Sequence, residues 1–374
     1  MRIAIVIPGG LGVKHAPVTI PFLYDLIERL SQFHEIRVYS LARVDEHKSR
    51  LRIGNFQVYA LSASPTAPLP GRFYRLLRMV SSHHRRHSFH LLHGFWGFPA
   101  GFATVLLGTL LSLPAVVTLM GGETAAIPAI NYGNLLHPRL RRFTRWTCRR
   151  ADRLCTLTRF QHEALSQLGI TGDETTVIPI GANATLFKPA PKTLKPPYRF
   201  LHVGNLTEVK DQITLLKAFC QISQQTEAEL RIIGPDYLDG QLQQLAGELE
   251  IADRVSFLGK LEHGQLPHHY RWAHFLLHTS LHEGQGVVIA EAAASGVVVS
   301  GTRVGLIADL GGKYFATAAV GDANTLAQQV LRLIHHPDQY FALQKNALNW
   351  AISHDIDWTA EQYHRLYQQL KNGK

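Results

Sequence analysis

The chain has 374 residues, of which 46% are hydrophobic and 18% are charged, and this composition excludes an intrinsically disordered protein. The length favours two domains over a single hydrophobic core. The formal net charge is +10, and it is unevenly placed: residues 1–187 hold 21 Lys and Arg against 10 Asp and Glu, whereas residues 188–374 hold 17 against 18. The first half therefore carries the whole positive excess.

The sequence gives no sign of export or of a membrane span. Its first apolar run is only five residues long and stops at Pro8, which predicts a strand instead of a signal peptide. Residues 88–122 contain no charged side chain, but prolines and glycines divide them into strand, helix and strand. Cys148, Cys155 and Cys220 have neither a paired framework nor metal-ligand spacing, which favours reduced thiols. We therefore expect a cytoplasmic protein.

The first half alternates short apolar strands with helical stretches, which predicts a parallel, doubly wound sheet. The expected strands are 3–7, 36–41, 56–61, 91–95, 115–119, 154–157 and 177–180, and the expected helices are 18–31, 99–112 and 140–151. Residues 188–197 contain four prolines and predict a semi-rigid linker. Ligands of such sheets bind at the carboxyl ends of the strands.

The alternation restarts after the prolines. The expected strands are 200–203, 230–233, 255–258, 275–278 and 297–300, and the expected helices are 211–224, 240–249, 265–272 and one that ends at 296, with a terminal helix at 358–370. The predicted fold class is α/β, with two Rossmann-like doubly wound domains facing each other across a cleft. Their expected bounds are 1–187, a linker at 188–197, 198–355, and a terminal segment at 356–374.

The most informative stretch is 282–296, which follows an apolar strand and reads as a glycine turn and then a helix. Gly284 and Gly286 allow the backbone to approach a ligand, and the free N–H groups of the helix start attract an anion, so the pattern predicts a phosphate cradle. Glu283 precedes the turn and Glu291 lies inside the helix, so the two carboxylates can contact different parts of one ligand. The alternative is a helix-capping Glu291 and a solvated Glu283.

This stretch, with Glu-Gly-x-Gly, a second Glu eight residues after the first and then Ala-Ser-Gly, resembles the Glu-x7-Glu signature of retaining, family 4 type nucleotide-sugar glycosyltransferases of the GT-B fold. The resemblance implies transfer of a sugar from a nucleoside diphosphate donor, UDP favoured, to an acceptor hydroxyl, with no metal and no cofactor. It assigns Glu283 to the transferred sugar and Glu291 to the ribose hydroxyls. Gln285 stands where the family often has an aromatic residue. The resemblance also predicts that the C-terminal helix of 356–374 crosses back onto the first domain.

Other strand ends fit the same family less closely. Lys210 matches the family's phosphate-binding lysine, whereas Asn205 replaces the arginine five residues before it. The resemblance predicts donor contacts from further backbone and side-chain groups along the cleft. These candidates are Gly10, Gly12, Gly234, Leu258, Lys260, Gly284, Gln285, Gly286 and Val287.

On the acceptor side, the candidates are His93, Gly121, Gly122 and Glu123. His93 resembles one histidine of a family strand-end motif and is, with Glu283 and Lys210, a candidate catalytic residue; a packed histidine is the alternative. Met120 stands where many family members have a histidine that contacts the sugar. Either the N–H groups of Gly121 and Gly122 with Glu123 supply that contact, or the activity is altered. The expected acceptor is a glycan or a lipid-linked glycan, in polysaccharide or cell-envelope synthesis.

Two basic clusters, at 72–86 and 139–153, attract phosphate, and the first has the spacing of an amphipathic helix. An anionic membrane surface is therefore a candidate partner, with a solvated face as the alternative. No nucleic-acid motif accompanies the charge, so no nucleic acid is expected. Two other functions fit the same fold: a nucleotide-sugar epimerase, and a non-catalytic protein that binds nucleotide sugars. A dehydrogenase is disfavoured because the dinucleotide fingerprint is missing.

Overall fold

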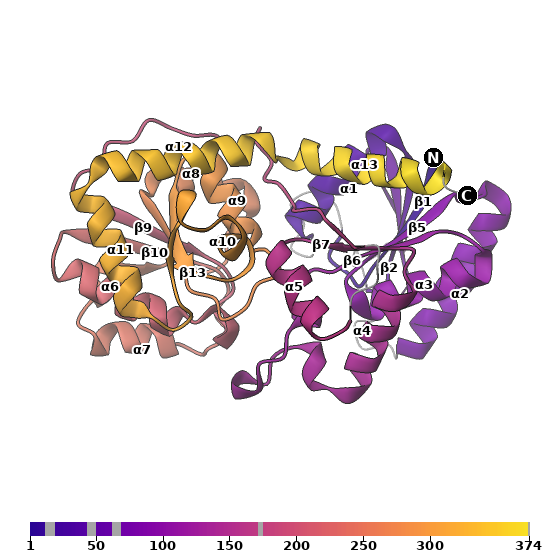
Figure 1. Cartoon of the computed structure of the whole chain (residues 1–374), viewed down its shortest axis with the longest axis horizontal. Coiled ribbons are helices and arrows are strands. Elements are labelled where there is room, and N and C mark those ends of the chain that lie inside the picture. Colours follow the sequence, from indigo (N-terminus) through magenta and orange to yellow (C-terminus); the bar gives the residue numbers. More distant parts are fainter. Residues whose placement is uncertain (12–18, 43–49, 62–68, 171–174, 373–374) are drawn as a thin grey trace. The chain divides into compact units, whose positions relative to one another are not determined.

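The computed structural model describes residues 1–11, 19–42, 50–61, 69–170 and 175–372, and it divides the chain into two compact units (Figure 1). Unit 1 is Met1–Ile180 with Ile356–Lys374, and unit 2 is Gly181–Asp355. Each unit has its own sheet with helices packed on it, so the predicted fold class of two doubly wound α/β domains is confirmed.

Unit 1 is built on an eight-stranded sheet of order β3-β4-β2-β1-β5-β6-β7-β8. The strands are β1 (Arg2–Ile7), β2 (Glu35–Ser40), β3 (Arg50–Ile53), β4 (Phe56–Ala60), β5 (Leu91–Phe95), β6 (Ala115–Thr118), β7 (Arg153–Thr156) and β8 (Thr175–Val177). The helices are α1 (Pro21–Phe33), α2 (Leu69–His87), α3 (Phe102–Leu111), α4 (Pro138–Arg150), α5 (Arg159–Gln167) and α13 (Ile356–Asn372). The last of these packs against α1 although more than 300 residues separate them in sequence.

Unit 1 differs from the predicted pattern in three places. The short strand β3 was not predicted, and it pairs antiparallel with β4 at the sheet edge, so the sheet is mixed instead of wholly parallel. Helix α5 was also not predicted; the Thr158 side chain caps it by accepting from the Gln161 N–H. The strand expected at 177–180 ends at Val177, because Pro179 has no N–H for the ladder.

Unit 2 has a six-stranded parallel sheet of order β11-β10-β9-β12-β13-β14. The strands are β9 (Tyr198–Val203), β10 (Ala228–Ile233), β11 (Val255–Phe257), β12 (Phe275–His278), β13 (Val298–Thr302) and β14 (Ala316–Ala318). The helices are α6 (Gln212–Ser223), α7 (Gln241–Glu248), α8 (Leu266–Trp272), α9 (Val287–Ala294), α10 (Gly305–Leu310), α11 (Ala323–His335) and α12 (Pro337–Ser353). The sequence analysis predicted the strands of unit 2 from β9 to β13, and it did not predict β14 or the helices α10, α11 and α12.

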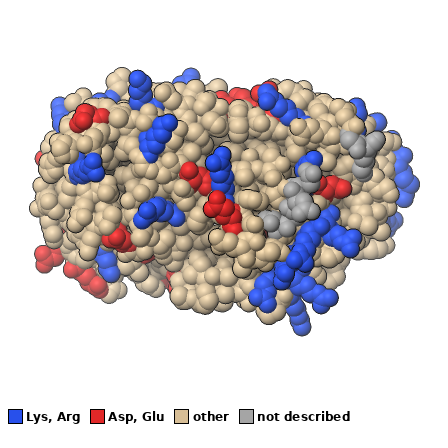
Figure 2. All heavy atoms as spheres, viewed as in Figure 1, with Lys and Arg blue, Asp and Glu red and all other residues tan. Residues whose placement is uncertain are grey.

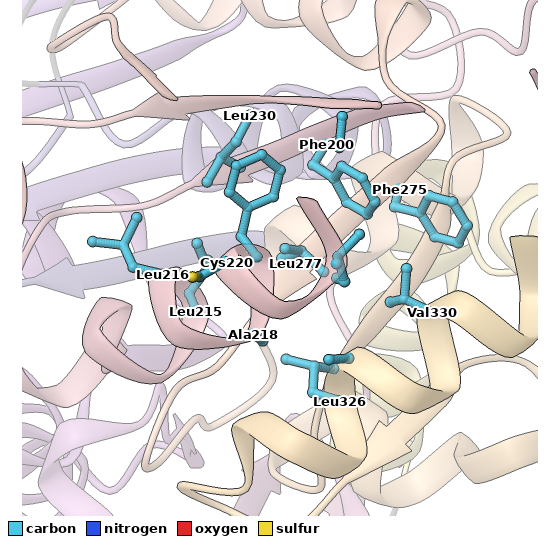
Figure 3. Close-up of a cluster of buried hydrophobic side chains, with 14 of the residues drawn as sticks. Phe200, Leu215, Leu216, Ala218, Cys220, Leu230, Phe275, Leu277, Leu326 and Val330 are labelled. Carbon is cyan, nitrogen blue, oxygen red and sulfur yellow. The ribbon is translucent and has the colours of Figure 1, made fainter. Parts of the chain in front are cut away.

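Two hydrophobic cores cover the faces of the unit 2 sheet. Alternation along β12 places Phe275 and Leu277 in one core and Leu276 in the other. Figure 3 shows Phe275 and Leu277 with side chains from α6 and α11 in the first core. These apolar contacts hold rigid the strands whose carboxyl ends carry the candidate site.

The proline-rich residues 188–197, predicted as a linker, pack on unit 2. The Lys192 ammonium donates to the carbonyl oxygens of Tyr270 and Ala273, at 3.0 and 2.6 Å, where α8 ends. Phe187 is also buried in a unit 2 core. The compact units therefore separate at Ile180 and not at the predicted position 187, because residues 181–197 find their packing partners in unit 2.

Candidate functional site

Two adjacent parallel strands of unit 2, β9 and β12, bring Lys210 and Glu283 together. Lys210 lies in the short helix Glu208–Lys210 after β9, and Glu283 follows β12. The two loops are tied to each other because the Leu281 N–H donates to the Val209 carbonyl at 2.8 Å. The Lys210 ammonium forms an ion pair with Oε1 of Glu283. The two residues predicted to act on sugar and phosphate are therefore in direct contact.

Three donors converge on one oxygen of Glu283. Besides Lys210, Oε1 contacts His278 Nε2 at 3.1 Å and accepts from the Ser280 hydroxyl at 2.8 Å. Burial acts to raise the pKa of Glu283, but the Lys210 ammonium and the His278 hydrogen bond outweigh it and hold the pKa well below its usual range. Oε2 accepts no hydrogen bond from the described residues. Within the described residues, Glu283 is thus an ionised carboxylate with one oxygen held by three donors and the other without a hydrogen bond.

Glu291 is held by a separate pair of side chains. It lies inside α9 and is 5% exposed, with Oε1 at 2.8 Å from His263 Nε2 and Oε2 accepting from the Tyr270 hydroxyl at 2.9 Å. Burial and the neighbouring carboxylate raise the pKa of Tyr270 well above its usual value, so its hydroxyl stays a donor. Each carboxylate oxygen has two lone pairs and can accept one more hydrogen bond. The helix-capping alternative for Glu291 is excluded by its position within the helix.

The turn between Glu283 and Glu291 combines a left-handed glycine with an uncapped helix start, which is a backbone arrangement that can bind an anion. Gly286 is left-handed, with φ of 83°, and a Cβ there would lie 2.7 Å from the Ile289 side chain, so only glycine fits without a shift. It precedes α9, whose start has no side-chain cap. Because the first N–H groups of a helix lack intrahelical acceptors, those near Val287 are available to an anion.

The predicted nucleoside contacts lie at the ends of β9, β10 and β11. Gly204 and Gly234 touch so closely that a Cβ on Gly234 would lie 1.8 Å from the Gly204 carbonyl oxygen, and the Gly234 N–H donates to the Gly259 carbonyl. The side chains of Asn205 and Lys260 are exposed beside these turns. Leu258 is partly buried and its N–H continues the ladder to β10. The donor candidates of unit 2 therefore gather at one edge of its sheet.

A buried histidine, His202, holds the Asn205 turn through the side chain of Gln212. His202 is fully buried, with Nδ1 at 2.9 Å from the Leu277 carbonyl and Nε2 at 3.2 Å from the Gln212 amide. The same amide donates to the Asn205 carbonyl at 3.0 Å. Burial lowers the pKa of His202 to about 3, so it is neutral and can accept from Gln212. The arrangement fixes the backbone that leads to Lys210.

The sequence prediction missed four residues that hold the glutamates: His278, Ser280, His263 and Tyr270. His278 is the last residue of β12 and Ser280 lies in the loop between β12 and Glu283, so their place at a strand end was a usable signal. The other two lie 28 and 21 residues before Glu291. No spacing rule connects them to that carboxylate, because the contacts depend on how the short helix His263–Gln265 and α8 lie beside α9.

His93 of unit 1 lies in the core. It is fully buried, with Nδ1 at 2.5 Å from the Tyr367 hydroxyl and Nε2 at 2.8 Å from the Thr118 hydroxyl. The Tyr363 hydroxyl lies 3.0 Å from the same Thr118 oxygen. Both ring nitrogens are occupied by β6 and α13, so this position favours the packed-histidine alternative over a catalytic or acceptor-binding role.

Glu123 is also turned into unit 1. It is 3% exposed, and its carboxylate accepts from the N–H groups of Met120, Gly121 and Gly97. Burial raises the pKa of Glu123, although these hydrogen bonds oppose the shift. The Gly121 N–H and the Glu123 carboxylate, which were predicted to contact the sugar, therefore bond to each other inside unit 1. Gly122 is only partly buried.

Of the first glycine-rich loop, Gly10 is described and Gly12 lies outside the described residues. The Gly10 carbonyl accepts from the Ile20 N–H at 2.6 Å, and a Cβ on Gly10 would lie 2.4 Å from the Ile20 side chain. Gly10 thus has a packing role that was not predicted.

The buried His93 predicts a pH-dependent stability of the protein. Burial lowers its pKa to about 3, so the folded state binds fewer protons than the unfolded chain once the pH falls below about 6.5. Each further pH unit, down to the folded pKa, then costs about 1.4 kcal/mol in the free energy of unfolding. We expect His93→Gln to reduce this dependence by about 2 kcal/mol between pH 7 and pH 5, measured by urea denaturation. The exposed His268→Gln serves as control; equal slopes in the two variants would contradict the prediction.

The described residues contain no group of three or more His, Cys, Asp or Glu side chains placed to hold a metal ion. In the same part of the chain, no helix combines the length and the apolar character needed to cross a bilayer. The three cysteines are buried and free.

Two family models match the chain. "Glycosyl transferases group 1" covers residues 185–350, and "Glycosyl transferase 4-like domain" covers residues 20–181. The chain is a family 4 type glycosyltransferase of the GT-B fold. Lys210, Glu283 and Glu291 lie within the group 1 match, so this glycosyltransferase carries the donor candidates of unit 2 in the matched region.

Individual relatives of this glycosyltransferase are distant. N-acetyl-alpha-D-glucosaminyl L-malate synthase of Bacillus anthracis is 29% identical over 183 residues, which are 46% of this chain and 47% of that protein. The solved sucrose-phosphate synthase from Thermosynechococcus elongatus has a TM-score of 0.83 at 19% identity and full coverage of both chains. Anabaena HepE in complex with UDP and glucose has a TM-score of 0.75 at 18% identity, covering 99% of this chain and 100% of that one. These structures establish the shared fold.

Proposed function

We propose that this glycosyltransferase moves a sugar from a UDP-sugar to an acceptor hydroxyl, with retained anomeric configuration and without a metal ion. The observation that carries the proposal is the Lys210–Glu283 ion pair at the ends of adjacent strands, followed by the glycine turn and Glu291. The UDP-bound HepE structure supports the choice of nucleotide. We place the reaction in the cytoplasm, in polysaccharide or glycolipid synthesis, with a glycan or lipid-linked glycan as acceptor.

In this proposal, different groups of unit 2 bind the diphosphate, the sugar and the ribose of the donor. The Lys210 ammonium and the first N–H groups of α9 offset the charge that develops on the departing diphosphate. Oε2 of Glu283 accepts from a sugar hydroxyl, while Glu291 accepts from the ribose diol. The bond from the anomeric carbon to the diphosphate breaks, a bond to the acceptor oxygen forms, and the diphosphate takes the acceptor's proton.

Thermal shift with a panel of nucleotide sugars tests the donor site, because a ligand that binds only the folded state raises its apparent stability. We expect a selective shift with one UDP-sugar in the wild type, and none in Glu291→Gln, which keeps the side-chain volume. Transfer is then measured with that donor. The proposal fails if no nucleotide shifts the wild-type protein, or if donor binds but is released as an altered nucleotide sugar without any acceptor.

Tyr270 is expected to act on donor affinity through Glu291. Tyr270→Phe removes the hydroxyl that holds Oε2 of the carboxylate, and loss of a hydrogen bond to a charged group costs about 1.5 kcal/mol or more. We therefore expect the dissociation constant for UDP, measured calorimetrically, to rise about tenfold.

Tyr340→Phe is the matched control for this measurement. Tyr340 is equally buried in unit 2, but its hydroxyl donates to the His274 carbonyl and touches neither glutamate. Equal losses of UDP affinity in the two variants would show that Tyr270 acts only through general stability.

A further inference from the structure

Helices α2, α3 and α4 of unit 1 form a face without acidic residues. Between residues 47 and 151 the sequence has a single acid, Glu123, and its carboxylate is buried against backbone N–H groups. Helix α2 carries five arginines and α4 carries six. Figure 2 shows Lys and Arg side chains gathered over the position that α4 has in Figure 1. The positive charge of unit 1 is therefore concentrated and uncompensated.

Aromatic side chains connect the three helices. The Phe73 ring of α2 lies 6.0 Å from that of Phe102 in α3, and Phe102 lies 5.1 Å from Phe143 and 5.0 Å from Trp146, both in α4. Phe98, in the turn before α3, stacks on Phe143 at 5.1 Å. The helices themselves pack α2 on α3 and α3 on α4. These five rings form one apolar strip across the face.

Phe73 and Trp146 pack on the cores of unit 1, and among the described residues the strip as a whole is only partly buried. Phe143 is 37% exposed and the other four rings are partly buried, while Leu110 at the end of α3 is 62% exposed and Tyr74 on α2 is 64% exposed. Exposed arginine side chains lie on the same helices, α2 and α4. They belong to Arg75, Arg78, Arg139, Arg141, Arg142 and Arg145.

We propose that the α2–α3–α4 face docks unit 1 on an anionic lipid bilayer. Basic side chains beside a partly exposed apolar strip match such a surface, since the arginines pair with lipid phosphates while the apolar side chains enter the headgroup region. Docking on this face would bring unit 1 to the membrane surface that carries a lipid-linked acceptor. The docking proposal rests on the proposed transferase function only for the identity of the acceptor.

The arrangement of the rings favours lipid over nucleic acid. Phe98 and Phe143 lie nearly parallel, with an interplanar angle of 10°, so each covers a face of the other. Binding of single-stranded nucleic acid relies on aromatic faces that stack on bases. An exposed leucine such as Leu110 has no base to stack on, whereas a bilayer takes up its side chain.

Vesicle co-sedimentation of the full chain, without sugar donor, tests the proposal. We expect binding to equimolar phosphatidylcholine and phosphatidylglycerol, and none to phosphatidylcholine alone. Arg142→Gln with Arg145→Gln lowers the partition coefficient roughly 30-fold, from about fivefold per arginine near the surface. Leu110→Ser also weakens binding, because it removes an apolar side chain without breaking a packed contact.

Matched substitutions on unit 2 are the controls: Lys217→Gln with Lys345→Gln removes the same charge, and Ile352→Ser removes an apolar side chain that is 52% exposed. Vesicle binding should be unchanged in both. The proposal is overturned if the wild type binds no anionic vesicle, if the controls lose as much binding as the unit 1 variants, or if polyuridylate binds while vesicles do not. Since no donor is present, these results leave the transferase proposal untouched, and loss of UDP binding leaves docking untouched.

Discussion

Replacing Glu283 by glutamine is expected to lower the turnover number of sugar transfer about a hundredfold, while UDP still binds. Glutamine keeps the volume of the side chain and an acceptor for Ser280, so the loop retains its shape. What disappears is the negative charge. The sugar hydroxyl then loses a charge-assisted hydrogen bond of about 1.5–3 kcal/mol, which corresponds to a factor of roughly ten to 150. Lys210 also loses its ionic partner.

Three measurements separate this effect from damage to the fold. The melting temperature of Glu283→Gln and its dissociation constant for UDP are compared with those of wild type, and single-turnover transfer with a saturating donor gives the chemical step. Glu227→Gln, an exposed acid on the same unit, controls for loss of one charge. If Glu283→Gln transfers sugar at the wild-type rate, Glu283 does not act on the donor, and the assignment of its open oxygen to the sugar is wrong.

The sequence was sufficient to predict the strand–turn–helix around Glu283 because each part of it has a local cause. The apolar run that begins at Phe275 predicts a buried strand at 275–278, Gly286 permits the left-handed turn, and the alanine-rich run favours a helix. Lys210 was linked to Glu283 only through the family resemblance. Their contact in the structure follows from the pairing of β9 with β12, which no local pattern specifies.

The burial of the His93 and Glu123 side chains could not be predicted from local sequence patterns, for a different reason. His93 lies within β5 and Glu123 in the loop after β6, near the carboxyl edge of the unit 1 sheet, where ligand-binding residues are common. Yet α13 brings Tyr367 from 274 residues away to one nitrogen of His93, and the backbone of Met120 and Gly121 folds onto Glu123. Whether a polar strand-end residue faces a ligand or the core depends on such packing, and neither hydrophobic periodicity nor spacing encodes it.

Truncating Phe275 in Phe275→Ala is expected to destabilise unit 2 by about 3–5 kcal/mol, the usual cost of removing a buried aromatic side chain and leaving a cavity. Its ring is fully buried and lies 5.2 Å from the rings of both Phe200 and Tyr340, as the core close-up illustrates for Phe200 (Figure 3). The loss removes the packing that joins β9, β12 and α12. Chemical denaturation of the full chain, followed by the fluorescence of its tryptophans, measures the change.

Phe341→Ala is the matched control, since Phe341 is in the same unit but 40% exposed, and its truncation should cost less than about 1 kcal/mol. The effect of Phe275→Ala should also reach the site, because His278 follows three residues later on β12 and fixes Oε1 of Glu283. At a temperature where the variant is still folded, we therefore expect weaker donor binding from Phe275→Ala than from Phe341→Ala. Equal stability of the two variants would mean that this core relaxes to fill the cavity and that β12 does not depend on it to hold the candidate site.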